Sequence, residues 1–219
     1  AVPPEIVAGQ IKAVMDDIKP RAVKVGMVND IDTINAIADT LANYDIQHLV
    51  VDPVMVATSG ARLMQDEAVE VFTKKLLPMA SLLTPNVPEA EVLAGIPIND
   101  KDSMEKAAHI IHSKGCKALL IKGGHIEGRK IDRLYTAMGM EREYEAANVA
   151  TRNTHGTGCT LSSAITSYLA MGYAIGEAIA AAKEWLTGAL TAGANVEIGS
   201  GHGPVNHFYN PQKTIIKTK

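Results

Sequence analysis

The sequence lacks the marks of several classes of protein. It has only two cysteines in 219 residues, Cys116 and Cys159, without CxxC spacing, so a disulfide-stapled fold is excluded and no disulfide is expected. No apolar run reaches the roughly 18 residues of a membrane span. No basic stretch followed by an apolar core stands at the N-terminus, as a signal peptide requires. We therefore expect a cytoplasmic protein.

Excess charge of either sign is also missing. The chain has 21 Lys and Arg against 24 Asp and Glu, a net charge of −3, which gives no reason to expect a nucleic-acid or membrane partner. Hydrophobic residues make up 47% and charged residues 21%, which is typical of a folded globular chain. The length suits one large domain.

Two hydrophobic periods alternate along the chain, one typical of helices and one of strands. The expected helices cover 5–18, a segment from Asp32 or Thr33 to 41, 67–77, 88–93, a segment to 114 whose start is flanked by Asp102 and Glu105, 157–171 and 174–195. The expected strands cover 21–28, 48–52, 82–84, 118–122, 134–136 and 143–149. This alternation predicts an α/β domain with a parallel sheet covered on both faces, and the last two strands form an edge hairpin.

The predicted strands end in polar or glycine-rich residues. The first four run into GMVND at 26–30, DPVM at 52–55, TPN at 84–86 with Glu89 beyond it, and KGGH at 122–125. All strands of a parallel sheet end at one edge, and ligands of such folds bind there. Loops after strands are polar in any case, but four such ends on one edge favour a binding site.

A glycine-rich turn, NTHGTGCT at 153–160, opens directly into an apolar helix. Unpaired N–H groups at a helix N-terminus attract phosphate, and glycine permits close approach of the chain to the anion. The string is not a Walker A loop, a dinucleotide fingerprint or a GxSxG elbow. Cys159 falls in the first helical turn, where a thiolate is favoured, so it is a base, a nucleophile or an inert packed residue.

An anion loop together with an Asp, an Asn–Glu pair and a Lys indicates phosphoryl transfer. Carboxylates hold Mg²⁺ directly or through water, and a lysine and backbone donors offset charge on the transferring phosphate. A base takes the proton from the attacking hydroxyl group.

Six strings make the chain similar to one family: KVGMV at 24–28, VVDPVMVATSG at 50–60, TPNVPEAEVL at 84–93, IKGGH at 121–125, HGTGCTLSSAI at 155–165 and GHGPVNH at 201–207. In this order they resemble the hydroxymethylpyrimidine/phosphomethylpyrimidine kinases of thiamine biosynthesis, which are ribokinase-like. The resemblance implies a three-layer αβα fold with a mostly parallel central sheet, as one domain over 1–219. It also implies an ATP-dependent kinase that uses Mg²⁺ and phosphorylates 4-amino-5-hydroxymethyl-2-methylpyrimidine and then its monophosphate.

The resemblance assigns the anion hole and the base. Gly156, Thr157, Gly158 and Cys159 match the loop that faces the transferring phosphate. Most superfamily members have Asp at the last position of this loop as the catalytic base. Cys159 stands there in this chain, so it is the candidate base for the substrate hydroxymethyl group.

Further matches concern the metal, the phosphates and the pyrimidine. Asp52 and Glu89 match residues near Mg²⁺. The expected nucleotide or phosphate contacts are Asn86, Lys122, Gly123 and, as a weaker match, Lys183. The alternative for Lys183 is an ordinary exposed helix lysine. The expected pyrimidine contacts are Gly26, Met27 and Val54, for which core packing is the alternative.

The chain departs from the family at its start. A strand with a glycine-rich segment and a TAQNT-like stretch, which supply polar contacts to the pyrimidine, do not stand before Pro3. We therefore expect an N-terminally incomplete domain whose sheet lacks a strand. Two other functions stay open, a pyridoxine or pyridoxal kinase with the same Cys-containing loop and a non-catalytic pyrimidine-binding protein. The alanine-rich stretch at 178–182 suggests close helix contact, within the domain or in a homodimer.

Overall fold

The computed structural model describes residues 2–55, 63–123 and 131–213. Its elements in chain order are α1 (Pro4–Asp17), β1 (Ala22–Val25), α2 (Ile31–Leu41), β2 (His48–Val51), α3 (Asp66–Lys75), the 3₁₀ turn η1 (Leu77–Met79), β3 (Leu82–Leu83), α4 (Val87–Ala94), α5 (Lys101–Ser113), β4 (Ala118–Ile121), β5 (Ile131–Thr136), β6 (Gly139–Glu145), α6 (Thr157–Ala170) and α7 (Ile175–Gly193). Every helix and strand expected from the sequence is present, with ends that differ by a few residues.

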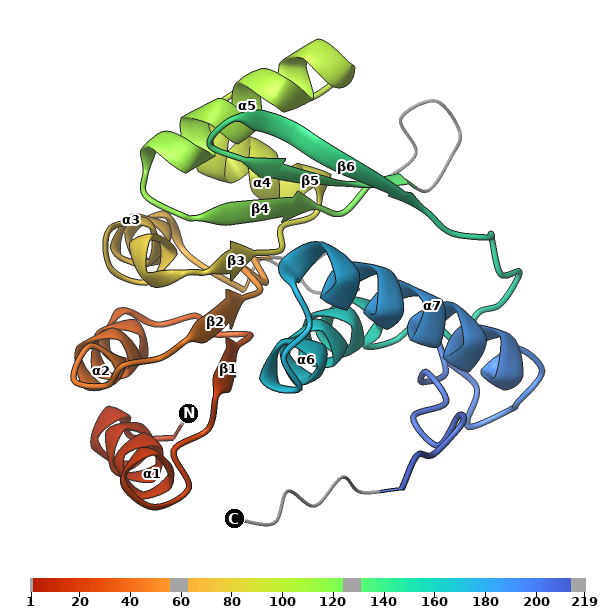
Figure 1. Ribbon diagram of the computed structural model, residues 1–219, viewed down its shortest axis with the longest axis horizontal. Coiled ribbons are helices and arrows are strands. Elements are labelled where there is room, and N and C mark those ends of the chain that lie inside the picture. The colour runs from red at the N-terminus through yellow and green to blue at the C-terminus, as the bar shows by residue number, and fades with distance from the viewer. Residues whose placement is uncertain (1, 56–62, 124–130, 214–219) are drawn as a thin grey trace.

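The strands form one six-stranded sheet in chain order, from β1 to β6 (Figure 1). β1 to β4 are parallel, because a helix on the sheet connects each strand to the next. β5 and β6 are antiparallel and form the hairpin at the far edge. The predicted mostly parallel sheet with an edge hairpin is therefore confirmed.

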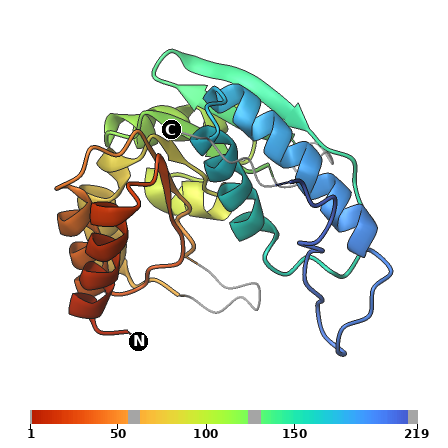
Figure 2. The same ribbon diagram turned by 60° about the horizontal axis from the view of Figure 1, so that its bottom comes forward.

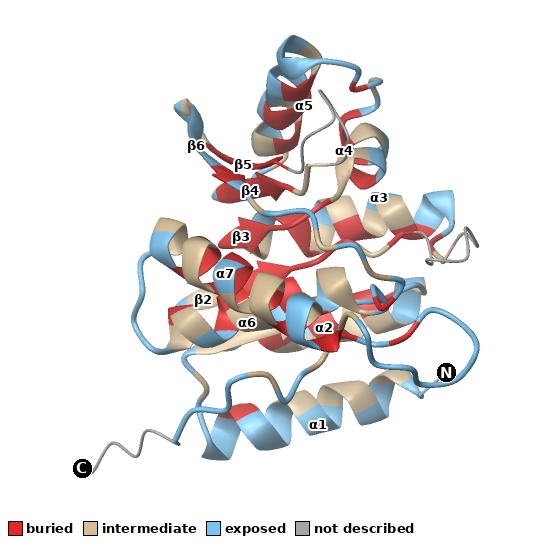
Figure 3. Ribbon diagram, turned by 90° about the vertical axis from the view of Figure 1, so that its right-hand side faces the viewer, coloured by how far each residue is buried: buried red, intermediate tan, exposed pale blue. Residues whose placement is uncertain are grey.

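Helices cover both faces of this sheet, so the predicted three-layer αβα arrangement is confirmed. Helices α1 to α5 pack on one face, and α6 and α7 pack on the other (Figures 1 and 3). Side chains alternate along a strand, and each strand supplies both cores. Val51 and Leu83 face α1 to α5, whereas their neighbours Val50 and Leu82 face α6 and α7.

Two helix starts differ from the sequence prediction. Asp30, rather than Asp32 or Thr33, caps α2: its backbone is extended and its side chain accepts a hydrogen bond from Thr33 N at 2.8 Å. Asp100 caps α5 in the same way through Ser103 N at 2.7 Å, so Asp102 lies inside the first turn. An N-cap side chain accepts from the N–H two or three residues further on, and in both helices the earlier Asp has the extended backbone and makes this bond.

β1 is the last strand at its edge of the described sheet, and an apolar groove of about 450 Å³ lies beside it. Side chains from α1, β1 and α2 line the groove. That a further strand belongs at this edge stays a prediction. In the described part of the chain, no helix is both long and apolar enough to cross a membrane.

Candidate active site

Strand alternation brings three polar side chains to the α6 face at the carboxyl edge of the sheet. Asp52, Thr84 and Lys122 each stand two residues beyond an apolar residue that packs against α6 and α7. Those apolar residues are Val50, Leu82 and Leu120. Because residues i and i+2 of an extended chain share a face, the polar side chains point to the same side.

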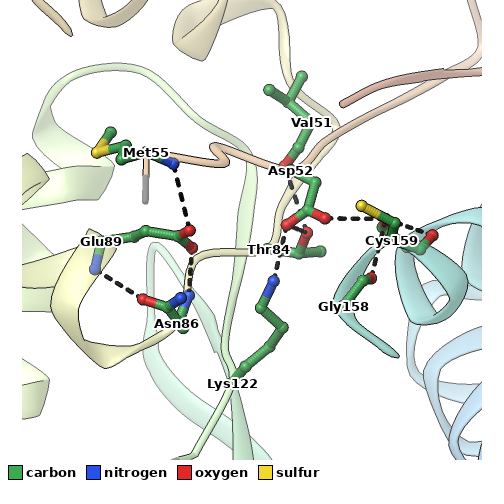
Figure 4. Close-up of polar contacts among 10 residues, drawn as sticks. Val51, Asp52, Met55, Thr84, Asn86, Glu89, Lys122, Gly158 and Cys159 are labelled. Atoms are coloured by element: carbon green, nitrogen blue, oxygen red, sulfur yellow. Dashed lines mark hydrogen bonds and ion pairs between the residues drawn. The ribbon is translucent and has the colours of Figure 1, made fainter. Parts of the chain in front are cut away.

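Asp52 is the centre of this group (Figure 4), and its side chain is buried. Its Oδ1 accepts hydrogen bonds from Lys122 Nζ at 2.7 Å and Thr84 Oγ1 at 3.1 Å. Its Oδ2 accepts one from Ser162 Oγ of α6 at 3.2 Å. A buried carboxylate is tolerated when it is paired and hydrogen-bonded, and these three donors supply both conditions.

Lys122 lies against the first turn of α6. A Cβ atom placed on Gly158 would stand 3.4 Å from Lys122 Nζ. Ser162 belongs to the next turn of α6, and the bond from its hydroxyl to Asp52 Oδ2 ties the start of this helix to Asp52. An ammonium group has three N–H donors. Among the described residues, Lys122 Nζ donates a hydrogen bond to Asp52 Oδ1, so its other N–H groups remain available to an anion at the start of α6.

The glycine-rich turn begins α6 as the sequence predicted. Gly156 is the N-cap with φ of +80°, the left-handed region in which a side chain is strained. The first helical bond runs from Thr160 N to Gly156 O at 2.8 Å. The N–H groups of Gly158 and Cys159 precede that bond and have no backbone acceptor among the described residues. Cys159 is exposed, so it is not an inert packed residue.

Asn86 and Glu89 form a capping box at the start of α4. Asn86 Oδ1 accepts from Glu89 N, and Glu89 Oε2 accepts from Asn86 N, both at 2.8 Å. Asn86 also pairs with Lys122 in a parallel bridge, which places α4 beside the lysine. Burial raises the pKa of the Glu89 carboxyl above 4.5, and Lys122 opposes that shift. A nearby cation therefore stabilises the charged form of Glu89.

Asp52 and Glu89 suit a magnesium ion that is also held by a nucleotide. Counting only donors among the described residues, Asp52 Oδ2 and both Glu89 oxygens each accept one bond, which leaves each a lone pair. Mg²⁺ is usually held by one or two carboxylates, several waters and substrate phosphates. Among the described residues no group of three His, Cys, Asp or Glu side chains could hold a metal alone. The donor set fits such a shared ion.

The expected pyrimidine contacts lie near this group. Met27 follows β1 and Val54 follows β2, and Asp52 N donates to Val25 O at 2.9 Å, which ties the two strand ends together. Met27 is 59% exposed, so core packing does not explain it. Gly26 lies close to a lysine, since a Cβ atom there would be 2.6 Å from Lys24 Nζ. The substrate role of these residues stays a prediction.

Lys183 is not the exposed helix lysine that the sequence left as its alternative. Its side chain is 11% exposed and forms an ion pair with Asp132 of β5. Asp132 Oδ1 also accepts from Gly123 N at 2.8 Å. A Cβ atom on Gly123 would meet Ile131 O, so only glycine fits there. A phosphate contact by Lys183 stays a prediction.

The sequence analysis did not select three residues of this network, Thr84, Ser162 and Asp132. Thr84, just after β3, and Asp132, within β5, each stand two residues from a buried leucine, and that alternation was the available signal. Ser162 had none, because its role depends on how α6 packs. His125 and residues 56–60 of the second string lie outside the described residues.

A lysine–aspartate pair beside a glycine-rich helix start, at the carboxyl edge of a three-layer αβα sheet, is the arrangement expected of the ribokinase-like class of phosphotransferases. A family model described as phosphomethylpyrimidine kinase matches residues 1–206, and the chain belongs to this family. The resemblance and the fold inferred from the sequence are thereby confirmed.

Curated relatives agree with that assignment. The chain is 46% identical over 208 residues to the thiamine biosynthesis bifunctional protein ThiED of Geobacter sulfurreducens, covering 94% of this chain and 42% of that protein. It is 45% identical over 206 residues to the hydroxymethylpyrimidine/phosphomethylpyrimidine kinase of Rhizobium meliloti, covering 94% and 77%. The chain thus spans less than half of the first relative and about three quarters of the second.

Solved structures give the same fold. The phosphomethylpyrimidine kinase of Clostridium difficile 630 matches with a TM-score of 0.75 and 43% identity, over 85% of this chain and 76% of that one. The pyridoxal kinase of Staphylococcus aureus in complex with ADP matches with a TM-score of 0.83 and 30% identity, over 95% and 75%.

Proposed function

We propose that this chain carries the catalytic site of an ATP-dependent kinase that phosphorylates 4-amino-5-hydroxymethyl-2-methylpyrimidine and then its monophosphate. The family and the names of its relatives support the substrate. The observation that carries the chemistry is the contact of Lys122 with both Asp52 and the first turn of α6. Lys122 and the first turn of α6 provide a positive charge and N–H donors, which stabilise negative charge on a transferring phosphoryl group.

In the proposed reaction the substrate hydroxymethyl oxygen attacks the terminal phosphorus of ATP, the bond to the bridging oxygen breaks, and ADP leaves. Lys122 and the N–H groups of Gly158 and Cys159 stabilise charge on the transferring group. Asp52 holds Lys122 in place, and the exposed Cys159 accepts the hydroxyl proton as a base. Bound Mg²⁺, held by Asp52 and Glu89 with the phosphates, would neutralise further charge.

ADP release by the complete protein tests this proposal, with hydroxymethylpyrimidine and pyridoxal assayed in parallel at saturating MgATP. We expect a higher kcat/KM for hydroxymethylpyrimidine and at least a tenfold loss of kcat in Lys122→Met. Lys74→Met is the matched control, because Lys74 lies on the exposed side of α3. Absence of ADP release with both substrates would favour a non-catalytic binding protein.

Pyridoxal phosphorylation is the second candidate, because pyridoxal kinases are among the similar structures. One from Staphylococcus aureus was solved with AMP-PCP and pyridoxal, and it matches with a TM-score of 0.81 and 31% identity. A higher kcat/KM for pyridoxal in the parallel assay would establish this activity instead.

Three further properties belong to the same proposal. Activity requires Mg²⁺, so EDTA abolishes it and added Mg²⁺ restores it. The protein works in the cytoplasm, which fractionation of cells tests. It forms a homodimer, which a mass measurement in solution tests, and a monomer at the assay concentration would exclude this state.

A further inference from the structure

The motif GHGPVNH at 201–207 takes no part in the chemistry above, yet it lies against the anion loop. Figure 2 shows the segment after α7 leaving the end of that helix and looping back. His155 N, one residue before the N-cap of α6, donates to Gly203 O at 3.1 Å. His155 and Pro204 also pair in an isolated parallel bridge. The motif therefore joins the backbone that leads into the anion loop.

Close packing fixes this contact. A Cβ atom on Gly203 would stand 2.0 Å from Asn153 Oδ1, so only glycine fits beside that side chain. Asn153 is buried, and its Nδ2 donates to Gly193 O and Val196 O, both at 2.7 Å. The start of the loop is thus tied both to the motif and to the end of α7.

The rest of the segment is anchored on α7. Val205 is buried in the core that α6 and α7 share. Tyr209 lies against Gly188, where a Cβ atom would stand 2.4 Å from its ring, and it makes an edge contact with Trp185. His207 lies between Val205 and Tyr209 in the sequence. It is exposed, and its ring contacts Thr160 in the first turn of α6.

His207 contacts the loop through one hydroxyl group. Its Nε2 lies 3.0 Å from Thr160 Oγ1, and that hydroxyl donates to Gly156 O at 2.8 Å. A hydroxyl has one hydrogen, so when it is donated to Gly156 O the Thr160 oxygen accepts from the imidazole, and we assign the ring hydrogen to Nε2 on that basis. Thr160 N also donates to Gly156 O at 2.8 Å. The Gly156 carbonyl is thus held by two donors of Thr160, one of which is oriented by His207.

We propose that His207 is a positioning residue of the kinase. It belongs to the segment 203–209, which packs against α7 and the start of α6, and it is the residue of that segment that contacts Thr160. The peptide unit is planar, so fixing the Gly156 carbonyl fixes the direction in which the chain enters the first turn. That turn presents the N–H groups of Gly158 and Cys159. The inference rests on the proposed function, in which these groups bind the transferring phosphate.

The test uses two variants of His207 and one control in the complete protein. His207→Phe keeps a ring and removes the donor, whereas His207→Gln places an amide N–H near the position of Nε2. His202→Phe is the control, because His202 is an exposed histidine of the same segment whose ring bonds the Arg152 carbonyl instead. We measure kcat, the KM of both substrates, and hydrogen exchange of the amides at 156–160.

Because His207→Phe removes a single neutral hydrogen bond, its effect on kcat and on amide exchange should be modest. We expect His207→Phe to lower kcat about twofold to tenfold and to speed amide exchange at 156–160 by a similar factor. The KM of the pyrimidine should stay unchanged, His207→Gln should recover most of the loss, and His202→Phe should match the wild type. Adding Thr160→Val to His207→Phe should cost less than the sum of both single effects, since they share one contact.

Unchanged kcat and exchange in His207→Phe would overturn the inference. An equal loss in His202→Phe would also overturn it, because the segment would then act only through general structure. If the wild-type protein releases no ADP, the proposed kinase function fails. In that case the exchange measurement still decides whether His207 positions the loop.

Discussion

Replacing Gly158 with alanine separates the stability of α6 from the chemistry at its first turn. The backbone at Gly158 is outside the left-handed region, and the nearest atom to an added Cβ is Lys122 Nζ at 3.4 Å, an ordinary contact. Alanine therefore fits without strain. It also restricts the unfolded chain, so we expect Gly158→Ala to raise the free energy of unfolding by about 0.4–1 kcal/mol. For a protein of this size that raises Tm by about 1–4 °C.

The same methyl group should damage catalysis. It would lie beside the Lys122 ammonium and the N–H groups of the turn, in the space that the proposed phosphate occupies. Losing one preorganised donor to a developing charge costs about a hundredfold to a thousandfold in kcat. A methyl group would shift the phosphate without removing a donor, so we expect a smaller loss, of at least tenfold in kcat. A variant that is more stable and less active is the signature of this geometry.

Thermal unfolding and ADP release measure the two effects on one preparation. Gly9→Ala is the matched control, because Gly9 lies within α1 and an added Cβ there meets nothing within 4 Å. It should gain similar stability and keep full activity. Gly158→Asp should abolish turnover, since its carboxylate would bind Lys122 in place of phosphate. Full activity in Gly158→Ala would refute the assignment of this turn as the phosphate site.

Three further predictions concern the side chains around the same turn. Cys159→Ala should lower kcat more than it raises the KM of the pyrimidine, with Tm unchanged because Cys159 is exposed, and full turnover would remove it from the base role. Asp52→Ala should cost about 3 kcal/mol in urea unfolding, because it leaves Lys122 without its buried partner; a cost below about 1 kcal/mol would contradict this. Burial raises the pKa of Glu89 above 4.5, so its contribution to stability is complete below pH 4.5 and declines as pH rises through the folded-state pKa. The stability difference between Glu89→Gln and wild type should therefore change just above pH 4.5, and a flat difference there would count against a buried Glu89.

The sequence predicted that the candidate site residues Asp52 and Lys122 lie at one edge of the sheet, because they occupy regular positions. Asp52 and Lys122 stand at the ends of apolar strands, and the order of strands in a parallel sheet brings such ends to one edge. Gly156 and the apolar residues after it predicted the start of α6 from local chemistry alone, and the binding of an anion there stays a prediction. In each case the signal lies within about ten residues, so a single sequence contains it.

The side-chain contacts that the sequence did not predict join residues that are far apart in the chain. Lys183 pairs with Asp132, 51 positions away, and Thr160 meets His207, 47 positions away. Nothing local in either segment distinguishes these side chains from solvent-facing ones. The cap of α2 could not be predicted for a different reason, because Asp30 and Asp32 are both suitable and only the backbone geometry selects between them.

The pair of Asp52 and Lys122 is better explained by function than by stability. A buried ion pair gives little net stability, because desolvation of both charges offsets their attraction. An apolar pair would suit this face of the sheet, where Val50 and Leu120 already pack against α6 and α7. The pair instead keeps an ammonium group fixed beside the first turn of α6 when no phosphate is bound. In the proposed reaction, preorganisation of this kind would lower the barrier to phosphoryl transfer, since little reorientation is needed as the phosphoryl group moves.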